Sequence, residues 1–156
     1  MSVSGKVSRA VDDAVRRSAR RGVLYTVAAG NEGANACHTS PARAGAGTNN
    51  GIVTVAATGG SGSEAGFSNF GRCVDIWAPG VGILSTRRGG GTIRKSGTSA
   101  AAPHAAGGAA LYRSMHAAVR PSGVEVKLKR SAARPLIWSK SGGPIRRLFV
   151  GRSAGF

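Results

Sequence analysis

The fold of this chain is decided first by the uncharged stretch Val23-Leu24-Tyr25-Thr26-Val27-Ala28-Ala29, which runs directly into Gly30-Asn31. A continuous apolar run of this length suits a strand that is buried on both faces, as in a parallel sheet. Two further runs, at 52–57 and 74–78, have the same character and are separated from it by loops rich in Gly, Ser and Asn. The pattern predicts one α/β domain with a mostly parallel sheet.

Helices are expected before and after these strands. Ser8 can cap a helix that runs to about Arg21, where Gly22 ends it. A helix of small residues is expected over 99–116, and another over 122–132. The residues expected on one face of the first helix are Val11, Ala14, Val15 and Ser18. The short segments 83–86 and 92–95 are expected to pair around the turn Gly89-Gly90-Gly91.

The charge of the chain points at first toward nucleic acid. Its 156 residues include 22 Lys and Arg against 6 Asp and Glu, a formal net charge of +16. The stretch 22–86, however, is close to neutral, and the basic residues lie on either side of it. Aromatic residues, the usual stacking partners of bases, make up only 5 %. A non-catalytic basic module that binds nucleic acid or acidic surfaces is therefore the alternative function, with nucleic acid the less expected partner.

Neither a membrane span nor a leader peptide is expected from this sequence. No run approaches the ~18 consecutive apolar residues that a spanning helix needs. The first residues, Met-Ser-Val-Ser-Gly-Lys, place no apolar core behind a positive charge, so no signal peptide is predicted in this chain.

The most informative motif is Gly97-Thr98-Ser99-Ala100-Ala101-Ala102-Pro103-His104. A serine in the first turn of a helix, after a Gly-Thr loop, lies at the positive end of the helix dipole. An oxyanion forming beside Ser99 would be met by the backbone N–H of that residue. The more common role of such a serine is to cap the helix, and both interpretations stay open from the motif alone.

A second candidate is Asn31, at the end of the first predicted strand. Strand ends of parallel sheets are where α/β folds place their ligands. The side-chain amide of Asn31 could donate to an oxyanion, or Asn31 could simply occupy a turn conformation that asparagine tolerates well.

Several segments together carry a family resemblance. In order they are Val27-Ala28-Ala29-Gly30-Asn31, Ala36-Cys37-His38-Thr39-Ser40-Pro41-Ala42, the run from Phe67-Ser68-Asn69-Phe70-Gly71 to Ala78-Pro79-Gly80, Ile83-Leu84-Ser85, and Ser96-Gly97-Thr98-Ser99 through to Gly107. With these motifs the chain resembles the subtilisin-like serine proteases (subtilases), most closely their proteinase K branch. The resemblance implies a three-layer subtilisin-like fold, mostly parallel sheet with flanking helices, and a serine endopeptidase activity on polypeptide substrates.

The resemblance also implies a role for individual residues. Ser99 falls on the nucleophile, and Asn31 on the side chain that shares the oxyanion hole with the Ser99 N–H. Residues implied to bind substrate are Ala28, Ala29 and Gly30, as a wall of the specificity pocket, and Ser2, Val3 and Ser4, near the strand that pairs with substrate. His104 falls on a motif histidine that packs structurally and is not the base.

The catalytic base and the acid that orients it are the parts of the family pattern that this chain lacks. Family members carry them in an Asp-Thr-Gly and a His-Gly-Thr motif, and neither occurs here. We therefore expect residues 1–150 to be the C-terminal half of a subtilisin-like peptidase domain, followed by a tail at 151–156. A serine without its base is a poor nucleophile, so we expect the chain to be inactive unless a complementary N-terminal half supplies the base.

Two further features follow from the resemblance. Cys37 and Cys73 fall where exported relatives form a disulfide, which implies a secreted parent protein. Asp75, an acid inside an apolar run, falls where proteinase K-type enzymes bind Ca²⁺, with the carbonyls of Asn50 and Ile52 as further ligands. An ordinary ion pair or hydrogen bond is the alternative partner for Asp75, since a buried carboxylate normally has one.

Overall fold

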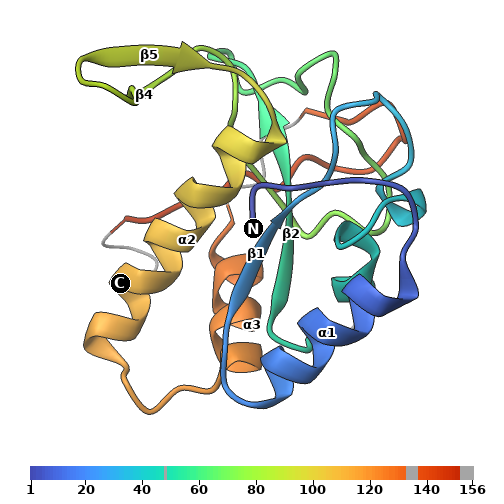
Figure 1. Ribbon diagram of the computed structural model, residues 1–156, viewed down its shortest axis with the longest axis vertical. Coiled ribbons are helices and arrows are strands. Elements are labelled where there is room, and N and C mark those ends of the chain that lie inside the picture. The colour runs from blue at the N-terminus through green and yellow to red at the C-terminus, as the bar shows by residue number, and fades with distance from the viewer. Residues whose placement is uncertain (48, 133–136, 152–156) are drawn as a thin grey trace.

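The computed structural model describes residues 1–47, 49–132 and 137–151, and contains one small parallel sheet with helices on both faces (Figure 1). Its helices are α1 (Arg9–Arg20), α2 (Thr98–Met115) and α3 (Pro121–Ser131), with short 3₁₀ turns η1 (Ala36–His38) and η2 (Ala42–Gly45). Its strands are β1 (Tyr25–Ala28), β2 (Ile52–Thr58), β3 (Ile76–Pro79), β4 (Ile83–Thr86) and β5 (Thr92–Lys95).

The three apolar runs form the parallel sheet, in the order β1-β2-β3, as predicted. Tyr25 pairs with Ile52 at one side of β2, and Val55 pairs with Ile76 at the other. Every residue of β2 is buried, because this strand has a neighbour on each edge and packing on each face. The α/β fold class is confirmed.

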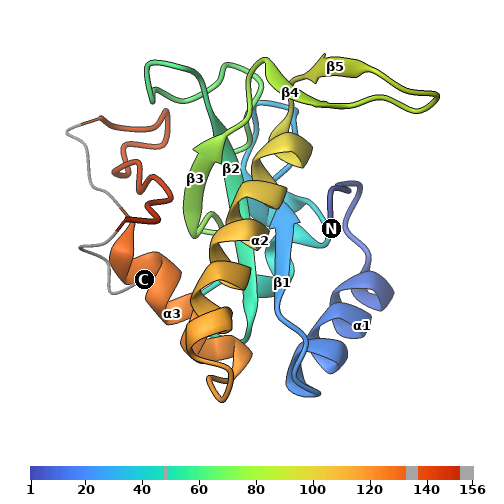
Figure 2. The same ribbon diagram turned by 90° about the vertical axis from the view of Figure 1, so that its left-hand side faces the viewer.

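The side chains of the sheet alternate between two packed faces. On one face, Val53, Val55 and Ala57 of β2 pack with small residues of α2 and with Val124 and Leu128 of α3. On the other, Ile52 packs with residues of α1, and Ala56 with Trp77 and the loop that follows β1. Figure 2 shows α2 and α3 side by side on one side of the strands and α1 on the other. The three layers match the predicted architecture.

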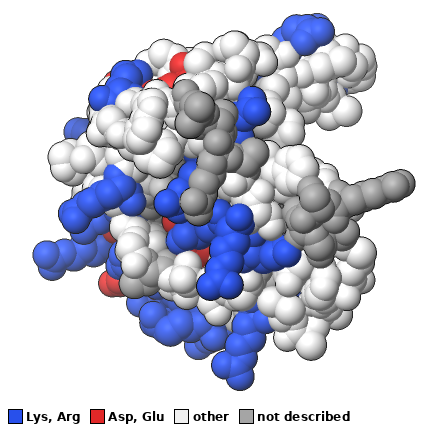
Figure 3. All heavy atoms as spheres, turned by 180° about the vertical axis from the view of Figure 1, so that it is seen from behind, with Lys and Arg blue, Asp and Glu red and all other residues white. Residues whose placement is uncertain are grey.

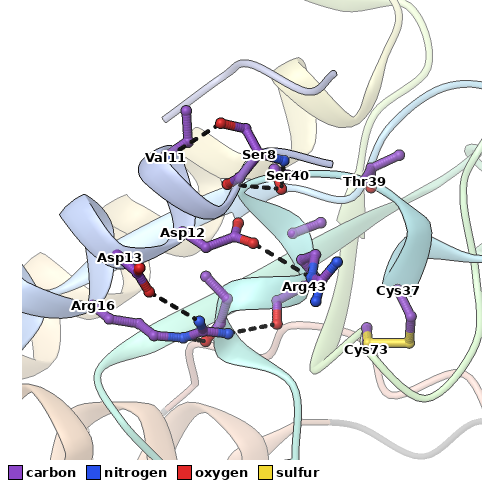
Figure 4. Close-up of polar contacts among 12 residues, drawn as sticks. Ser8, Val11, Asp12, Asp13, Arg16, Cys37, Thr39, Ser40, Arg43 and Cys73 are labelled. Atoms are coloured by element: carbon purple, nitrogen blue, oxygen red, sulfur yellow. Dashed lines mark hydrogen bonds and ion pairs between the residues drawn. A yellow bond between two sulfur atoms is a disulfide. The ribbon is translucent and has the colours of Figure 1, made fainter. Parts of the chain in front are cut away.

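Helix α1 begins where the sequence predicts, but its buried face differs from the expected one. The Ser8 hydroxyl accepts a hydrogen bond from the Val11 N–H at 3.4 Å, which caps the helix. The buried residues are Asp12, Val15 and Ala19, whereas Val11 and Ala14 are exposed. Asp12 lies inside because its carboxylate pairs with the guanidinium of Arg43 in η2 at 3.3 Å (Figure 4). An apolarity pattern could not reveal that buried ion pair.

The antiparallel hairpin of β4 and β5 extends away from the rest of the fold (Figures 1 and 2). It forms around Gly89-Gly90-Gly91, as predicted, and its residues are mostly exposed. Within the described ranges, none of the helices combines the length and the apolar character that crossing a membrane requires.

Candidate active site

The candidate nucleophile lies where α2 begins, at the carboxyl end of the sheet. Thr98 and Ser99 form the first turn of the helix, and Gly97 precedes them with a φ of 149°. A side chain at Gly97 would adopt that backbone conformation only under strain, and its Cβ would lie 3.1 Å from the Ser99 Oγ. The glycine therefore keeps the space directly before Ser99 open.

The amide of Asn31 has an orientation that its hydrogen bonds determine. Its Oδ1 accepts from the backbone N–H of Thr98 at 2.8 Å and from the Thr98 hydroxyl at 3.0 Å. A backbone N–H can only donate, so the oxygen of the amide must face Thr98 and the Nδ2 must face away from it. The missing Cβ of Gly97 would lie 3.6 Å from the Oδ1 and 3.7 Å from the Nδ2 of Asn31, so the Asn31 amide and the Ser99 hydroxyl border one space.

Thr98 holds this arrangement together, and sequence reasoning did not single it out. Its hydroxyl donates to Asn31 and accepts from the backbone N–H of Gly30 at 3.1 Å, and the whole residue is buried. The end of β1 and the start of α2 are thus joined through one side chain. The role of Thr98 depends on the burial of its hydroxyl, and burial cannot be read from the sequence. The sequence therefore held no signal that would have singled it out.

The residues expected to bind substrate lie near Ser99 in two separate groups. Ala28, Ala29 and Gly30 are buried at the end of β1. A Cβ on Gly30 would collide with the side chain of Asn69, whose Nδ2 donates to the Ala29 carbonyl at 3.0 Å. The role of these three residues as a pocket wall stays a prediction.

The second group is the N-terminal segment. The hydroxyl of Ser2 donates to the Ser99 carbonyl at 2.8 Å, and the Met1 carbonyl accepts from the Ala28 N–H at 3.1 Å. Val3 is exposed and Ser4 is half-buried. The segment thus lies along β1 and beside Ser99, and its pairing with a substrate backbone stays a prediction.

A groove of about 730 Å³ opens beside Ser99. Its walls come from β4, the end of β5 and the exposed side of α2, and include Leu84, Lys95 and Leu111. Neither of the two groups expected to bind substrate lines this groove.

No described histidine is hydrogen-bonded to Ser99. The Nδ1 of His104 contacts the Ala100 carbonyl at 2.9 Å within α2, and that of His116 contacts the Tyr112 carbonyl at 3.0 Å. His38 lies exposed in η1 beside the disulfide. Ser99 therefore has no base among the described side chains.

The two cysteines form the disulfide that the resemblance implied. Cys37 and Cys73 are joined across a separation of 36 residues, which ties the loop after β1 to the segment before β3 (Figure 4). This loop also holds Asn31, and Cys73 lies two residues before Asp75, so the disulfide links the loop of Asn31 to the segment that leads to Asp75.

Asp75 has two partners in the structure. Its Oδ2 accepts from the Thr54 N–H at 2.8 Å, and its Oδ1 lies 2.9 Å from the ammonium of Lys129 in α3. Lys129 also contacts the Oε1 of Glu125 at 3.1 Å. A calcium ion could not bind to Asp75 while the ammonium of Lys129 occupies this position, because the two cations would repel each other. Binding of calcium through Asp75, Asn50 and Ile52 stays a prediction.

Burial and the attraction between opposite charges shift the pKa values of Asp75, Glu125 and Lys129 in opposite directions. Burial raises the pKa of Asp75 and of Glu125, and hydrogen bonds from Thr54 and Gly51 and the charge of Lys129 oppose that rise only in part. Burial also lowers the pKa of Lys129, but the two carboxylates outweigh it and leave that pKa raised. Lys129 is therefore a cation at neutral pH.

The basic side chains cover much of the surface opposite to the view of Figure 1. Figure 3 shows Lys and Arg gathered over the middle and lower part of that face, with acidic side chains recessed between them. Binding of nucleic acid or acidic surfaces there stays a prediction.

Comparison with known proteins shows the family to which this chain belongs. The family described as "Subtilase family" matches residues 1–150, and the chain belongs to this family of serine peptidases. It is 41 % identical over 149 residues to alkaline serine exoprotease A of Vibrio alginolyticus, and 44 % identical over 126 residues to the extracellular serine proteinase of Thermus sp. (strain Rt41A). The crystal structure of a cold adapted subtilisin-like serine proteinase has a TM-score of 0.90 to it and 40 % sequence identity.

These relatives are much longer than this chain. The matches cover 96 % and 80 % of the chain, but 27 % and 30 % of the two named proteases. The solved structure is matched over 97 % of this chain and 54 % of its own. The subtilase family and the subtilisin-like fold are therefore established, whereas the placement within the proteinase K branch stays a prediction.

Proposed function

We propose that this chain carries the nucleophile and the oxyanion hole of a serine endopeptidase that cleaves polypeptides. In this proposal the Oγ of Ser99 bonds to the carbonyl carbon of the scissile peptide, and the hydroxyl proton passes to a base. The carbonyl oxygen becomes an oxyanion that accepts from the Ser99 N–H and from the Nδ2 of Asn31. The observation that carries the proposal is the pair of Thr98 hydrogen bonds that occupy the Asn31 Oδ1 and leave its Nδ2, near the missing Gly97 Cβ, without a partner among the described residues.

We infer that the chain needs a base from elsewhere to be efficient. The described part of the chain offers Ser99 no histidine, and in the family the base and its acid lie in the other half of the domain. An oxyanion hole alone preserves only a small part of the rate of a serine peptidase. A complementary N-terminal half is therefore the proposed partner, and the protein to which both halves belong is proposed to be exported, since the Thermus relative is named extracellular and this chain holds a disulfide.

The proposal is tested by labelling with a fluorophosphonate probe, followed by mapping of the modified peptide. The chain is assayed alone and with an added polypeptide that carries the N-terminal half of the Vibrio relative's catalytic domain. We expect slow labelling alone, much faster labelling in the mixture, and loss of both in Ser99→Ala. The matched control is Ser114→Ala, which removes an exposed serine of α2 that does not line the groove beside Ser99 and leaves labelling unchanged.

Labelling at a serine other than Ser99, or no labelling in either condition, would contradict the proposal. Salt-dependent retention on DNA that survives Ser99→Ala in a chain that labels nowhere would favour the alternative, a basic binding module.

A further inference from the structure

The cluster around Lys129 belongs to no part of the peptidase chemistry. Lys129 lies in α3, Asp75 directly precedes β3, and Glu125 lies one turn before Lys129. We propose that the ammonium of Lys129 is the resident cation of a site between α3 and the sheet, where it takes the place of a divalent metal and makes the fold independent of calcium.

The hydrogen bonds of the two carboxylates are nearly symmetrical around the ammonium. The Nζ of Lys129 lies 2.9 Å from one oxygen of Asp75 and 3.1 Å from one oxygen of Glu125. The second oxygen of Asp75 accepts from the Thr54 N–H, and the second oxygen of Glu125 accepts from the Gly51 N–H, both at 2.8 Å. Each carboxylate therefore has one oxygen on the backbone around β2 and the other on the ammonium.

Burial makes a cation necessary at this position. The side chain of Glu125 is fully buried, that of Asp75 is 9 % exposed and that of Lys129 is 22 % exposed. Two buried carboxylates without a counter-charge would strongly destabilise the folded chain. Because Glu125 and Lys129 are four residues apart on one helix, α3 brings its own cation when it packs on the sheet.

The neighbouring oxygen atoms leave little for a metal to bind. Ca²⁺ takes about six to eight oxygen ligands. The side chain of Asn50 cannot serve as a ligand in addition to its expected carbonyl, since its Oδ1 accepts from the Ile52 N–H at 3.1 Å and its Nδ2 donates to the Ala44 carbonyl at 3.0 Å. The Ile52 carbonyl is covered by the backbone of Gly45, where an added Cβ would lie 2.5 Å from its oxygen. Among the described residues, no group of three or more carboxylate, histidine or cysteine side chains surrounds the site.

A cavity beside the cluster gives a probe ion a route to Asp75 and allows metal binding to be tested. Asp75 and Lys129 both line a cavity of about 590 Å³ that opens to solvent and is also lined by Trp77. Of the two carboxylates only Asp75 lines it, and the basic residues Arg72 and Arg146 line it as well, so its lining does not suit a divalent cation. Trp77 is close enough to the cavity to sensitise the luminescence of Tb³⁺, a calcium substitute, if that ion entered it.

The experiment compares the full chain with Lys129→Met and with the matched control Arg130→Met. Arg130 is the next residue of α3 and is exposed. For the unchanged chain we expect equal Tm values in EDTA and in excess Ca²⁺, and no Tb³⁺ luminescence excited through tryptophan. For Lys129→Met we expect a Tm roughly 6–20 °C lower, from the typical loss on breaking a buried ion pair. Its Tm should be the same in EDTA and in Ca²⁺, because the remaining oxygen atoms are too few to hold the ion, whereas Arg130→Met should behave like the unchanged chain.

Three results would overturn the proposal. A Tm of the unchanged chain that rises with Ca²⁺, or Tb³⁺ luminescence from it, would show that a metal binds despite Lys129. A loss in Lys129→Met no larger than in Arg130→Met would show that the ammonium is not needed. Tb³⁺ luminescence from Lys129→Met would show that the remaining oxygen atoms suffice to hold a metal. If Lys129→Met does not fold at all, the need for the cation is supported. The Tm and Tb³⁺ measurements on the unchanged chain then decide whether a metal binds at the site.

Discussion

The candidate active site and the Lys129 cluster are both built from hydrogen bonds to backbone groups at the ends of strands, yet they differ in what is left unused. At the active site, Thr98 occupies the Asn31 Oδ1 and leaves the Nδ2 and the Ser99 hydroxyl facing an open space. In the cluster, every carboxylate oxygen of Asp75 and Glu125 has a partner. Unused donors beside an open groove suit chemistry, whereas complete pairing suits stability. A substitution at the active site should therefore slow labelling more than it lowers the free energy of unfolding. A substitution in the Lys129 cluster should lower the free energy of unfolding and leave labelling unchanged.

The largest effect is expected from Asp75→Ala. The change leaves Lys129 with one carboxylate instead of two and the Thr54 N–H without its acceptor. We expect the free energy of unfolding in urea to fall by about 3–5 kcal/mol, the range found on breaking buried ion pairs. The rate at which the folded fraction labels at Ser99 should not change, and a slower rate would show that the two regions are coupled.

The disulfide links the loop that holds Asn31 to the segment that precedes Asp75, and its removal tests whether the two regions are independent. Replacement of Cys37 and Cys73 by Ala opens a loop with a separation of 36 residues. We expect a loss of roughly 3–4 kcal/mol in unfolding free energy, from the greater entropy of the unfolded chain. If labelling per folded molecule fell as well, the loop that holds Asn31 would depend on the disulfide for its shape.

Asn31→Asp removes the proposed oxyanion donor and leaves an acceptor for the two hydrogen bonds from Thr98. Aspartate keeps an oxygen that can accept from Thr98, but replaces the Nδ2 donor by a second acceptor. Labelling in the reconstituted mixture should slow by about 100- to 1000-fold. Unfolding in urea should change little. A labelling rate within threefold of the unchanged chain would remove Asn31 from the proposed mechanism.

Thr98→Val should affect both measurements, and is the smallest of the four changes. The buried Gly30 N–H loses its acceptor, which costs about 1–3 kcal/mol of stability, and Asn31 keeps only the backbone N–H of its two Thr98 partners. A modest slowing of labelling should accompany the loss of stability. If only stability changed, the Thr98 N–H alone would suffice to orient Asn31.

The strands and the active-site segments could be predicted because each leaves a local mark in the sequence. A seven-residue apolar run such as β2 has few alternatives to a buried strand, and the Gly-Thr-Ser start of α2 carries a family motif. The partners of buried charges leave no such mark. The face expected for the first helix does not include Asp12, which is buried and pairs with Arg43, and nothing in the sequence distinguishes Lys129, which pairs with Asp75, from the other basic residues. Both depend on contacts between residues at least 31 positions apart, which only the folded chain brings together.

A crystal structure of the reconstituted protein after fluorophosphonate labelling tests the proposed active site most directly. The phosphonyl group should be bonded to the Oγ of Ser99, with one of its oxygens about 2.7–3.1 Å from both the Ser99 N and the Asn31 Nδ2. A phosphonyl oxygen that points to solvent, or an Asn31 amide turned away from it, would contradict the assignment of this pair as the oxyanion hole.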